Sequence, residues 1–280
     1  MFIFLNGKII EQREAVISPF DRGFQFSEGV YEVIRYYPEK FFSLHEHIDR
    51  LKYSLTELNI THPPLDNIET VLNELILRNN LSEELSIAYI QVTRGTQYPR
   101  RHSFSRDLSP TFFISAEKFP ANKKNMADGV RVGLEEDIRW ARCDIKTTSL
   151  LPNVLTSRRA DEKNFTEFIY HRNGKITEGA HTNVCFVRNN ELITPPLSNF
   201  ILSGITRKIV LRLCASLGIN YTEREIDLNE LKKIDEAMIL GTTTEITPVV
   251  EIEGMKVGSG EPGRVCRSLQ KAYTQLLTQL

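Results

Sequence analysis

The chain has 280 residues, enough to bury the core of one large or two medium-sized domains. Its 35 lysines and arginines nearly balance its 36 aspartates and glutamates, and a formal net charge of -1 excludes a global attraction to nucleic acid or an anionic membrane. Four widely spaced cysteines without a CxxC pair predict neither a zinc site nor a disulfide framework. The N-terminal residues do not resemble a signal peptide and no apolar run reaches membrane-spanning length, so we expect a cytoplasmic protein.

Hydrophobic patterns predict the elements of the first half. Asn6-Gly7 predicts a hairpin turn between two apolar arms, and residues 21–29 form a tight aromatic loop bracketed by glycines. The other elements expected here are a strand at 30–35, helices at 45–58 and 66–78, and strands at 86–93 and 111–116. Residues 120–125 lose all periodicity, which predicts a linker between two domains.

The second half alternates strands, hairpins and helices. The expected elements are a strand at 130–134, a helix at 151–163, a hairpin around Asn173-Gly174, a strand at 184–187, a helix at 206–217 ended by Gly218, a buried strand at 237–240 and a final helix at 262–280. Because hairpins outnumber βαβ units, we predict an α+β fold with a small domain at 1–119, a linker at 120–125 and a large domain at 126–280. A functional site is expected between these domains.

Two segments of the second half have the features of a phosphate site. Gly204-Ile205-Thr206 begins a predicted helix, where exposed N–H groups and the helix dipole favour an anion. Gly241-Thr242-Thr243-Thr244 follows a buried strand and offers further donors, and Arg50 offers a positive charge. Each also has an ordinary explanation, since Thr206 suits a helix N-cap, the threonine run suits a turn, and Arg50 suits a surface position.

Three further features suit chemistry on an amine and a carboxylate. Lys146 follows a charged run that is typical of a strand end, and an anchored lysine can form an imine. Glu178, beside a glycine at a strand end, can keep a ring nitrogen protonated. The loop at 94–102 contains three arginines and a histidine, which bind carboxylates. Taken singly, each is also explained by a solvated surface residue, and His45 and His47 point to different helix faces, which disfavours a metal site.

Together and in this order, these segments resemble the class IV, fold-type IV pyridoxal-phosphate aminotransferases, and among them the bacterial D-amino acid aminotransferases. The resemblance covers nearly the whole chain, from Asn6-Gly7 to the final helix. The matching stretches are Asp21-Arg22-Gly23, Gly29-Val30-Tyr31-Glu32, His47-Ile48-Asp49-Arg50-Leu51, Gln91-Val92-Thr93-Arg94-Gly95, Asp144-Ile145-Lys146, Thr177-Glu178-Gly179, Asn183-Val184, Gly204-Ile205-Thr206-Arg207 and Thr244-Glu245-Ile246-Thr247-Pro248.

The resemblance implies a pyridoxal 5'-phosphate cofactor and a role for each matching residue. Lys146 would form a Schiff base with the cofactor and carry the substrate proton, and Glu178 would pair with the ring nitrogen. The residues implied to hold the phosphate are Arg50, Ile205, Thr206 and Thr242, with Leu202 packed against the ring. The residues implied to bind the substrate α-carboxylate are Tyr31, Arg100 and His102.

The Pro-Arg-x-His arrangement of that loop favours D-amino acids, such as D-alanine or D-glutamate, as donors to a 2-oxo acid in a ping-pong reaction. The resemblance further implies a homodimer in which the Arg100–His102 loop serves the neighbouring subunit. Small hydroxyl residues are usual where this chain has Ala180-His181-Thr182, a serine is usual at Gly241, and Arg101 is bulkier than expected. An L-branched-chain aminotransferase, an aminodeoxychorismate lyase and a non-catalytic pyridoxal-phosphate-binding protein remain alternatives.

Overall fold

The computed structural model describes residues 1–279, and the chain divides into two compact units. Unit 1 comprises Met1–Pro120 with Ile145–Leu150, and unit 2 comprises Ala121–Asp144 with Leu151–Leu280. The predicted linker at 120–125 covers the passage from unit 1 to unit 2 and the beginning of helix α4 (Lys123–Asp128). The segment 145–150, which carries Lys146, belongs to unit 1 although it lies inside the sequence range of the predicted large domain. The domain bounds therefore stay a prediction.

Unit 1 is built on an antiparallel six-stranded sheet of order β2-β1-β6-β5-β3-β4. Asn6 and Gly7 both have positive φ (48° and 89°), as a two-residue hairpin turn requires, so the predicted first hairpin is confirmed. The strands are β1 (Phe2–Leu5), β2 (Lys8–Glu11), β3 (Gly29–Tyr37), β4 (Lys40–Phe41), β5 (Ser86–Thr93) and β6 (Thr111–Lys118), and the helices are η1 (Gln12–Glu14), α1 (Arg22–Phe26), α2 (Leu44–Glu57) and α3 (Ile68–Arg78).

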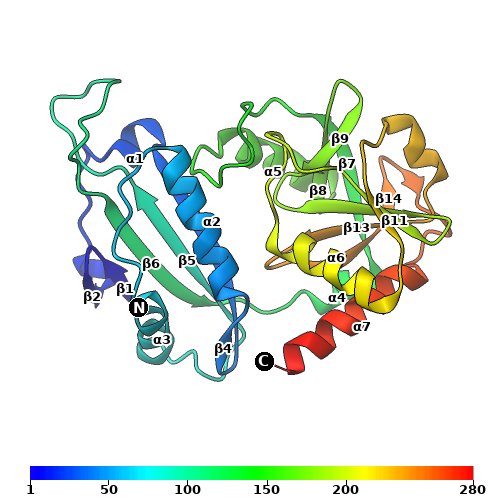
Figure 1. Ribbon diagram of the computed structural model, residues 1–280, viewed down its shortest axis with the longest axis horizontal. Coiled ribbons are helices and arrows are strands. Elements are labelled where there is room, and N and C mark those ends of the chain that lie inside the picture. Colours follow the sequence, from blue (N-terminus) through cyan, green and yellow to red (C-terminus); the bar gives the residue numbers. More distant parts are fainter. Residues whose placement is uncertain (280) are drawn as a thin grey trace. The chain divides into compact units, whose positions relative to one another are not determined.

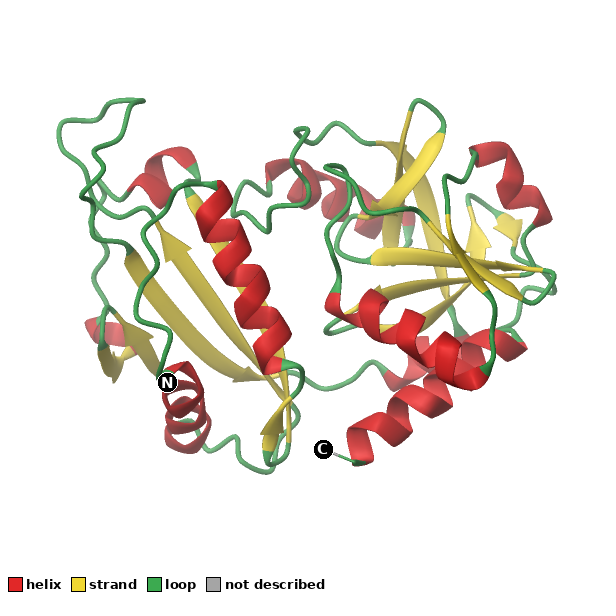
Figure 2. Ribbon diagram, viewed as in Figure 1, coloured by secondary structure: helices red, strands yellow, loops and turns green. Residues whose placement is uncertain are grey.

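Helices α2 and α3 supply one side of the core of unit 1 (Figures 1 and 2). Their fully buried leucines, including Leu51 and Leu75, join Val30 and Ile34 of β3 in one hydrophobic cluster. Because side chains alternate along a strand, Glu32 lies on the same face as these two residues, towards α2. One expectation was wrong, since residues 21–29 are not only a loop: they contain α1, which begins where the Asp21 carboxylate accepts the Gly23 N–H at 2.7 Å.

Unit 2 is built on a mixed nine-stranded sheet of order β12-β11-β10-β13-β14-β7-β8-β9, with β15 paired to β14. Strand β9 also packs against β10, so the sheet curls and brings the end of β9 beside the start of β10. The strands are β7 (Val130–Glu136), β8 (Glu167–Arg172), β9 (Lys175–Gly179), β10 (Asn183–Arg188), β11 (Glu191–Thr194), β12 (Tyr221–Glu223), β13 (Glu236–Gly241), β14 (Glu245–Ile252) and β15 (Met255–Lys256).

The helices of unit 2 are α4, α5 (Leu151–Lys163), α6 (Ile205–Leu217), η2 (Leu228–Lys233) and α7 (Arg264–Thr278). Gly218 ends α6 in the left-handed conformation, as predicted (φ 67°). The final helix was predicted to run to residue 280, and that residue lies outside the described part of the chain. Mixed helices and largely antiparallel sheets confirm the predicted α+β fold. Across residues 1–279, no helix combines the length and apolar character needed to cross a membrane.

Candidate functional site

In unit 1, Arg50 is anchored by a buried carboxylate. Its Nε and Nη2 atoms lie 2.7 and 2.9 Å from the two oxygens of Glu32, which is 0% exposed. His47 contacts the same carboxylate through Nδ1 at 2.7 Å. Burial alone would raise the pKa of Glu32, but Arg50 and His47 hold it well below its usual range. Because an ionised carboxylate only accepts, the His47 Nδ1 carries the shared proton.

The charge of His47 follows from its surroundings. Burial lowers the pKa of His47, and the positive charges of Arg50 and Lys146 lower it further, against the opposing effect of Glu32. A neutral His47 therefore donates to Glu32 while Arg50 supplies the positive charge of the cluster. Arg50 was predicted as an anion-binding residue, and Glu32 fixes the direction of its guanidinium group.

Lys146 is held in unit 1 by the first residues of β3 and by α2. Its backbone carbonyl accepts the Tyr31 N–H at 3.0 Å, and its own N–H donates to Ser54 of α2 at 3.2 Å. The Lys146 Nζ atom lies 4.3 Å from the centroid of the Tyr31 ring. Two predicted site residues are thus brought together. The charged run before Lys146 does end a strand, because β7 stops at Glu136, and Lys146 lies in the irregular segment that follows.

The predicted carboxylate-binding loop is an exposed part of unit 1. Arg100 lies over the Phe26 ring at 4.2 Å, and the His102 ring centroid is 5.4 Å from that of Phe26. Phe26 therefore gathers the two side chains at one place. Within residues 1–279 of this single chain, no hydrogen bond or ring contact joins Tyr31 to either of them. Of the three residues of the predicted carboxylate site, the described contacts thus join Arg100 and His102 through Phe26 and do not include Tyr31.

In unit 2, both oxygens of Glu178 have protein donors. Arg139 donates to Oε1 at 2.8 Å, while Asn183 Nδ2 and the Leu202 N–H donate to Oε2 at 3.1 and 2.9 Å. Burial raises the pKa of Glu178, and the Arg139 guanidinium opposes that rise. A carboxylate has about four acceptor positions, so these three bonds leave one for a further donor such as a protonated ring nitrogen.

Arg139 is itself fixed by Asp137. The Asp137 carboxylate accepts from the Arg139 Nε and Nη2 atoms, both at 2.9 Å, and also from Arg172 at 3.1 Å. Burial alone would lower the pKa of Arg139, but Asp137 and Glu178 raise it above its ordinary value. The arginine also stacks on the Tyr170 ring at 4.6 Å. The buried Asp137 carboxylate thus fixes Arg139, whose guanidinium group in turn orients Glu178.

Asn183 connects Glu178 to the start of α6. Besides donating to Glu178, its Nδ2 atom donates to the Leu202 carbonyl at 3.0 Å. A Cβ atom added to Gly204 would collide with the Asn183 side-chain oxygen, so only glycine allows this close approach. The loop that carries Leu202 and the N-terminus of α6 is therefore built around the Glu178 carboxylate.

The N-terminus of α6 has the features of an anion site. Its N-cap, Gly204, provides no side-chain cap, and no acidic residue occupies the first turn. The N–H groups of Ile205 and Thr206 stand there with the positive end of the helix dipole. Thr242 lies in the half-buried turn between β13 and β14. The sequence-predicted residues of unit 2 therefore comprise a buried carboxylate, Leu202 in the loop before α6, and donors of a kind that suits phosphate.

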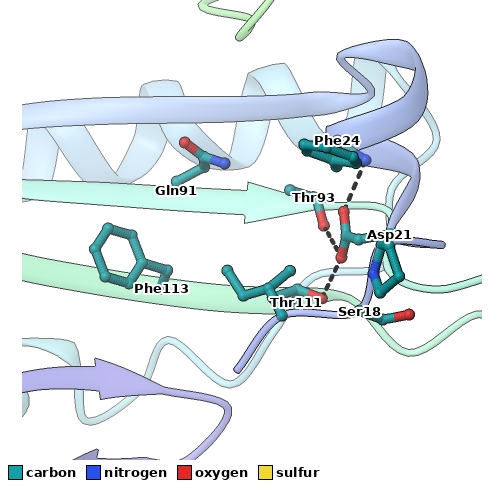
Figure 3. A pocket seen from close by; sticks show the side chains of 10 residues that line it. Ser18, Asp21, Phe24, Gln91, Thr93, Thr111 and Phe113 are labelled. Atoms are coloured by element: carbon teal, nitrogen blue, oxygen red, sulfur yellow. Dashed lines mark hydrogen bonds between the residues drawn. The ribbon is translucent and has the colours of Figure 1, made fainter. Parts of the chain in front are cut away.

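A separate cavity of about 480 Å³ lies in unit 1 (Figure 3). Asp21 at its wall accepts hydrogen bonds from the Gly23 N–H and from the hydroxyls of Thr93 and Thr111, as Figure 3 shows. None of the predicted site residues lines it. Because Asp21 already has these donors, its role here is to join α1 to strands β5 and β6.

Sequence reasoning missed the residues that orient the site. Glu32, His47 and Asn183 belong to stretches that match the family, yet no role was assigned to them, and Arg139 was seen only as part of a charged run. Some of their partners lie far along the chain; Arg139 and Glu178, for example, are 39 positions apart. The only local signal was the presence of a charged residue inside an otherwise apolar strand, as at Glu32. His181, whose orientation was left open, is exposed, and its ring contacts Ser157 at 2.7 Å.

Unit 1 thus carries a lysine and a fixed arginine, and unit 2 carries an uncapped helix terminus and a buried carboxylate. Groups of these kinds suit a phosphorylated pyridine cofactor. A family model described as "Amino-transferase class IV" matches residues 29–252, and the chain belongs to this family. Class IV aminotransferases depend on pyridoxal phosphate, so the resemblance, the enzyme class and the cofactor expected from the sequence are confirmed.

Named relatives cover almost the full length of the chain. A D-alanine aminotransferase of Listeria monocytogenes (serotype 1/2a, strain 10403S) is 36% identical over 282 residues, covering 100% of this chain and 97% of that protein. A D-alanine aminotransferase of Bacillus licheniformis is 39% identical over 281 residues, covering 97% and 95%. Among solved structures, a branched-chain amino acid aminotransferase of Escherichia coli has a TM-score of 0.89 and 26% identity over 98% of this chain and 93% of that chain.

The residues present fit pyridoxal phosphate. The remaining acceptor position of Glu178 suits the ring N–H, the α6 N-terminus with Thr206 and Thr242 suits the phosphate, and Lys146 is a half-buried amine beside an aromatic ring. Gly241, where the resemblance led us to expect a serine, offers no side-chain hydroxyl.

Proposed function

We propose that this enzyme transfers the amino group of a D-amino acid, such as D-alanine or D-glutamate, to a 2-oxo acid in two half-reactions. The observation that carries the D-preference is the loop Pro99-Arg100-Arg101-His102, whose arginine and histidine both pack on Phe26. An arginine and a histidine held together suit the α-carboxylate of a substrate. The names of the full-length relatives support the same substrate class.

Each site residue has a role in this proposal. The cofactor supplies an electron sink for the bond electrons released at the substrate Cα atom. Lys146 would hold the cofactor through its ε-amino group and, once that amine is free, would take the proton from the substrate Cα atom and redeliver it during transamination. Glu178, oriented by Arg139 and Asn183, would accept a hydrogen bond from the ring N–H and stabilise its positive charge.

The other residues would bind and orient the cofactor and the substrate. Arg50, directed by Glu32, and the groups at Ile205, Thr206 and Thr242 would hold the phosphate, with Leu202 against the ring. Tyr31, Arg100 and His102 would bind the α-carboxylate. A homodimer in which the loop serves the neighbouring subunit, as the family resemblance implies, is part of the proposal, as is the cytoplasmic location expected from the sequence.

The first test is a spectroscopic screen of the purified enzyme with D- and L-amino acids. We expect a visible absorbance band from the bound cofactor that D-alanine depletes and that borohydride reduces irreversibly. Lys146→Ala should abolish that band, and an unchanged band would remove Lys146 from the proposed role. Depletion by L-leucine but not by D-alanine would instead favour a branched-chain enzyme, release of pyruvate without an acceptor would favour a lyase, and depletion by no amino acid would favour a binding protein.

A second test concerns the loop and the homodimer together. Arg100→Ala should raise the KM for D-alanine far more than it weakens cofactor binding. We then expect inactive Lys146→Ala chains and impaired Arg100→Ala chains to regain activity when mixed dimers are formed by co-expression, because one of the two sites would combine an intact lysine with an intact loop. Mixed dimers without any gain would show that the loop does not serve a neighbouring subunit.

A further inference from the structure

Arg22 of α1 is a buried residue that the proposed chemistry does not use. It is 1% exposed, and its guanidinium group pairs with Glu28 through two hydrogen bonds of 2.8 and 2.6 Å. The same group donates from Nη1 to the Arg101 carbonyl at 2.6 Å and from Nη2 to the His102 carbonyl at 2.9 Å. One planar cation therefore connects a carboxylate to two successive backbone carbonyls of the substrate-binding loop.

These carbonyls belong to an irregular stretch of backbone. No helix or strand lies between the end of β5 at Thr93 and the start of β6 at Thr111, and the side chains from Tyr98 to Asp107 are exposed. Besides these bonds, the Gln97 side chain bonds Ser103 and Ser105 at 3.2 and 3.1 Å, both exposed, and the buried Arg94 lies over the Phe104 ring at 3.5 Å. Among the hydrogen bonds described for the middle of the loop, those from a buried charged group are the ones that Arg22 donates to backbone carbonyls.

Glu28 holds Arg22 in place with the help of a second arginine. Arg94 donates its Nε to Glu28 at 2.5 Å and its other two nitrogens to the carbonyls of Leu58 and Asn59, which end α2. Burial opposes ionisation of Glu28, but Arg22 and Arg94 lower its pKa below the ordinary value. The ionised carboxylate joins the loop on one side to α2 on the other.

We propose that Arg22 is a positioning residue for substrate binding, which sets the direction of the Arg100 and His102 side chains by fixing the backbone between and beside them. The carbonyl of Arg101 lies between the two functional residues and that of His102 follows directly, so holding both carbonyls determines which way the side chains leave the loop. Phe26, four residues beyond Arg22 on the same short helix, then supports both side chains. The inference rests on the proposed binding of the substrate carboxylate by Arg100 and His102.

The test compares Arg22→Met and Arg22→Lys with wild type as complete holoenzymes. Both variants should raise the KM for D-alanine on the order of 10- to 100-fold, because misplacing a binding group by about 1 Å has an effect of this size. The kcat at saturating donor and the absorbance of the bound cofactor should stay near wild type, as expected when only substrate binding is lost. Arg22→Lys keeps a positive charge beside Glu28. A single ammonium group cannot make the planar set of hydrogen bonds that the guanidinium group makes, so this variant should not restore the wild-type KM.

A double-mutant cycle separates positioning from general damage. In an Arg100→Ala background, Arg22→Met should change the KM by less than about twofold, because residues that act through one another are not additive. Leu75→Ala is the control: it empties a fully buried site in α3 of the same unit, so it lowers the melting temperature without contacting the loop and should leave the KM unchanged.

Trypsin provides a readout besides activity, since Arg100, Arg101 and Arg106 are exposed in the loop. Cleavage at these residues should be faster in Arg22→Met than in wild type or Leu75→Ala. Unaltered KM and cleavage in Arg22→Met, rescue of the KM by Arg22→Lys, or loss of the cofactor band would each overturn the inference. If Arg100→Ala itself leaves the KM unchanged, the proposed carboxylate site fails, whereas the cleavage result still decides whether Arg22 holds the loop.

Discussion

We predict that the buried carboxyl group of Glu167 gives this protein an unusual dependence of stability on pH. This first residue of β8 is buried, and its carboxyl group accepts from the Thr182 hydroxyl at 2.8 and 3.0 Å and from the His181 N–H at 3.3 Å. The contacts described for residues 1–279 pair it with no cation. Burial therefore raises the pKa of Glu167 to about 7, although its hydrogen bonds lower it somewhat.

The direction in which the free energy of unfolding changes with pH follows from proton linkage. Between the ordinary carboxyl pKa of 4.5 and the folded value of about 7, the folded protein binds more protons at Glu167 than the unfolded chain does. The free energy of unfolding must then fall as pH rises through this window. One pKa unit corresponds to about 1.4 kcal/mol, so Glu167 should remove about 2.5 kcal/mol of stability between pH 5 and pH 8.

Glu167→Gln tests this directly, because glutamine keeps the size of the side chain and cannot ionise. Denaturant unfolding of both proteins between pH 5 and pH 8 gives the difference in the free energy of unfolding at each pH. We expect wild type to lose about 2.5 kcal/mol relative to the variant across this range, with most of the change complete by pH 7. Parallel stability curves for the two proteins would refute the assignment of a protonated, buried Glu167.

Three further substitutions have defined outcomes. Gly204→Ala places a methyl group against Asn183, so the apparent Kd for pyridoxal phosphate, measured by absorbance titration, should rise about tenfold, and normal binding would contradict the close approach. Glu32→Gln leaves the buried Arg50 without its counter-charge and should lower the free energy of unfolding by about 3–5 kcal/mol; a loss below about 1 kcal/mol would argue against the buried pair. Gly218→Ala meets no neighbouring atom and is opposed only by its positive φ, so denaturant unfolding should show a loss of about 1 kcal/mol.

The secondary structure was largely determined by local patterns in the sequence. Asn-Gly pairs at 6–7 and 173–174 require turns with positive φ, and both lie in hairpins of the structure. The helix at 151–163, with Pro152 near its start, and the strand at 86–93 have the predicted bounds, because both signals depend only on neighbours in the chain. The helix within residues 21–29 was not predicted, because a helix of five residues is too short to show a hydrophobic period.

The reactive residues of the candidate site could also be recognised in the sequence, from their types and their order along the chain. Lys146, Glu178 and the glycine before α6 were identified together, and their order along the chain supported the family that the comparisons confirm. The roles assigned to these residues stay predictions. What the sequence determined about the site is therefore the set of reactive groups, because their chemistry belongs to the side chains themselves.

The tertiary structure alone decided how those groups are held. The contact of Arg50 with Glu32 depends on how α2 lies on β3, and the contact of Arg22 with the Arg101 carbonyl joins positions 79 residues apart. Lys146 belongs to unit 1 although the sequence on both sides of its segment belongs to unit 2. Hydrophobic periodicity reports which face of an element is buried, but the partner of a buried charge depends on the packing and register of distant elements, which no local pattern contains.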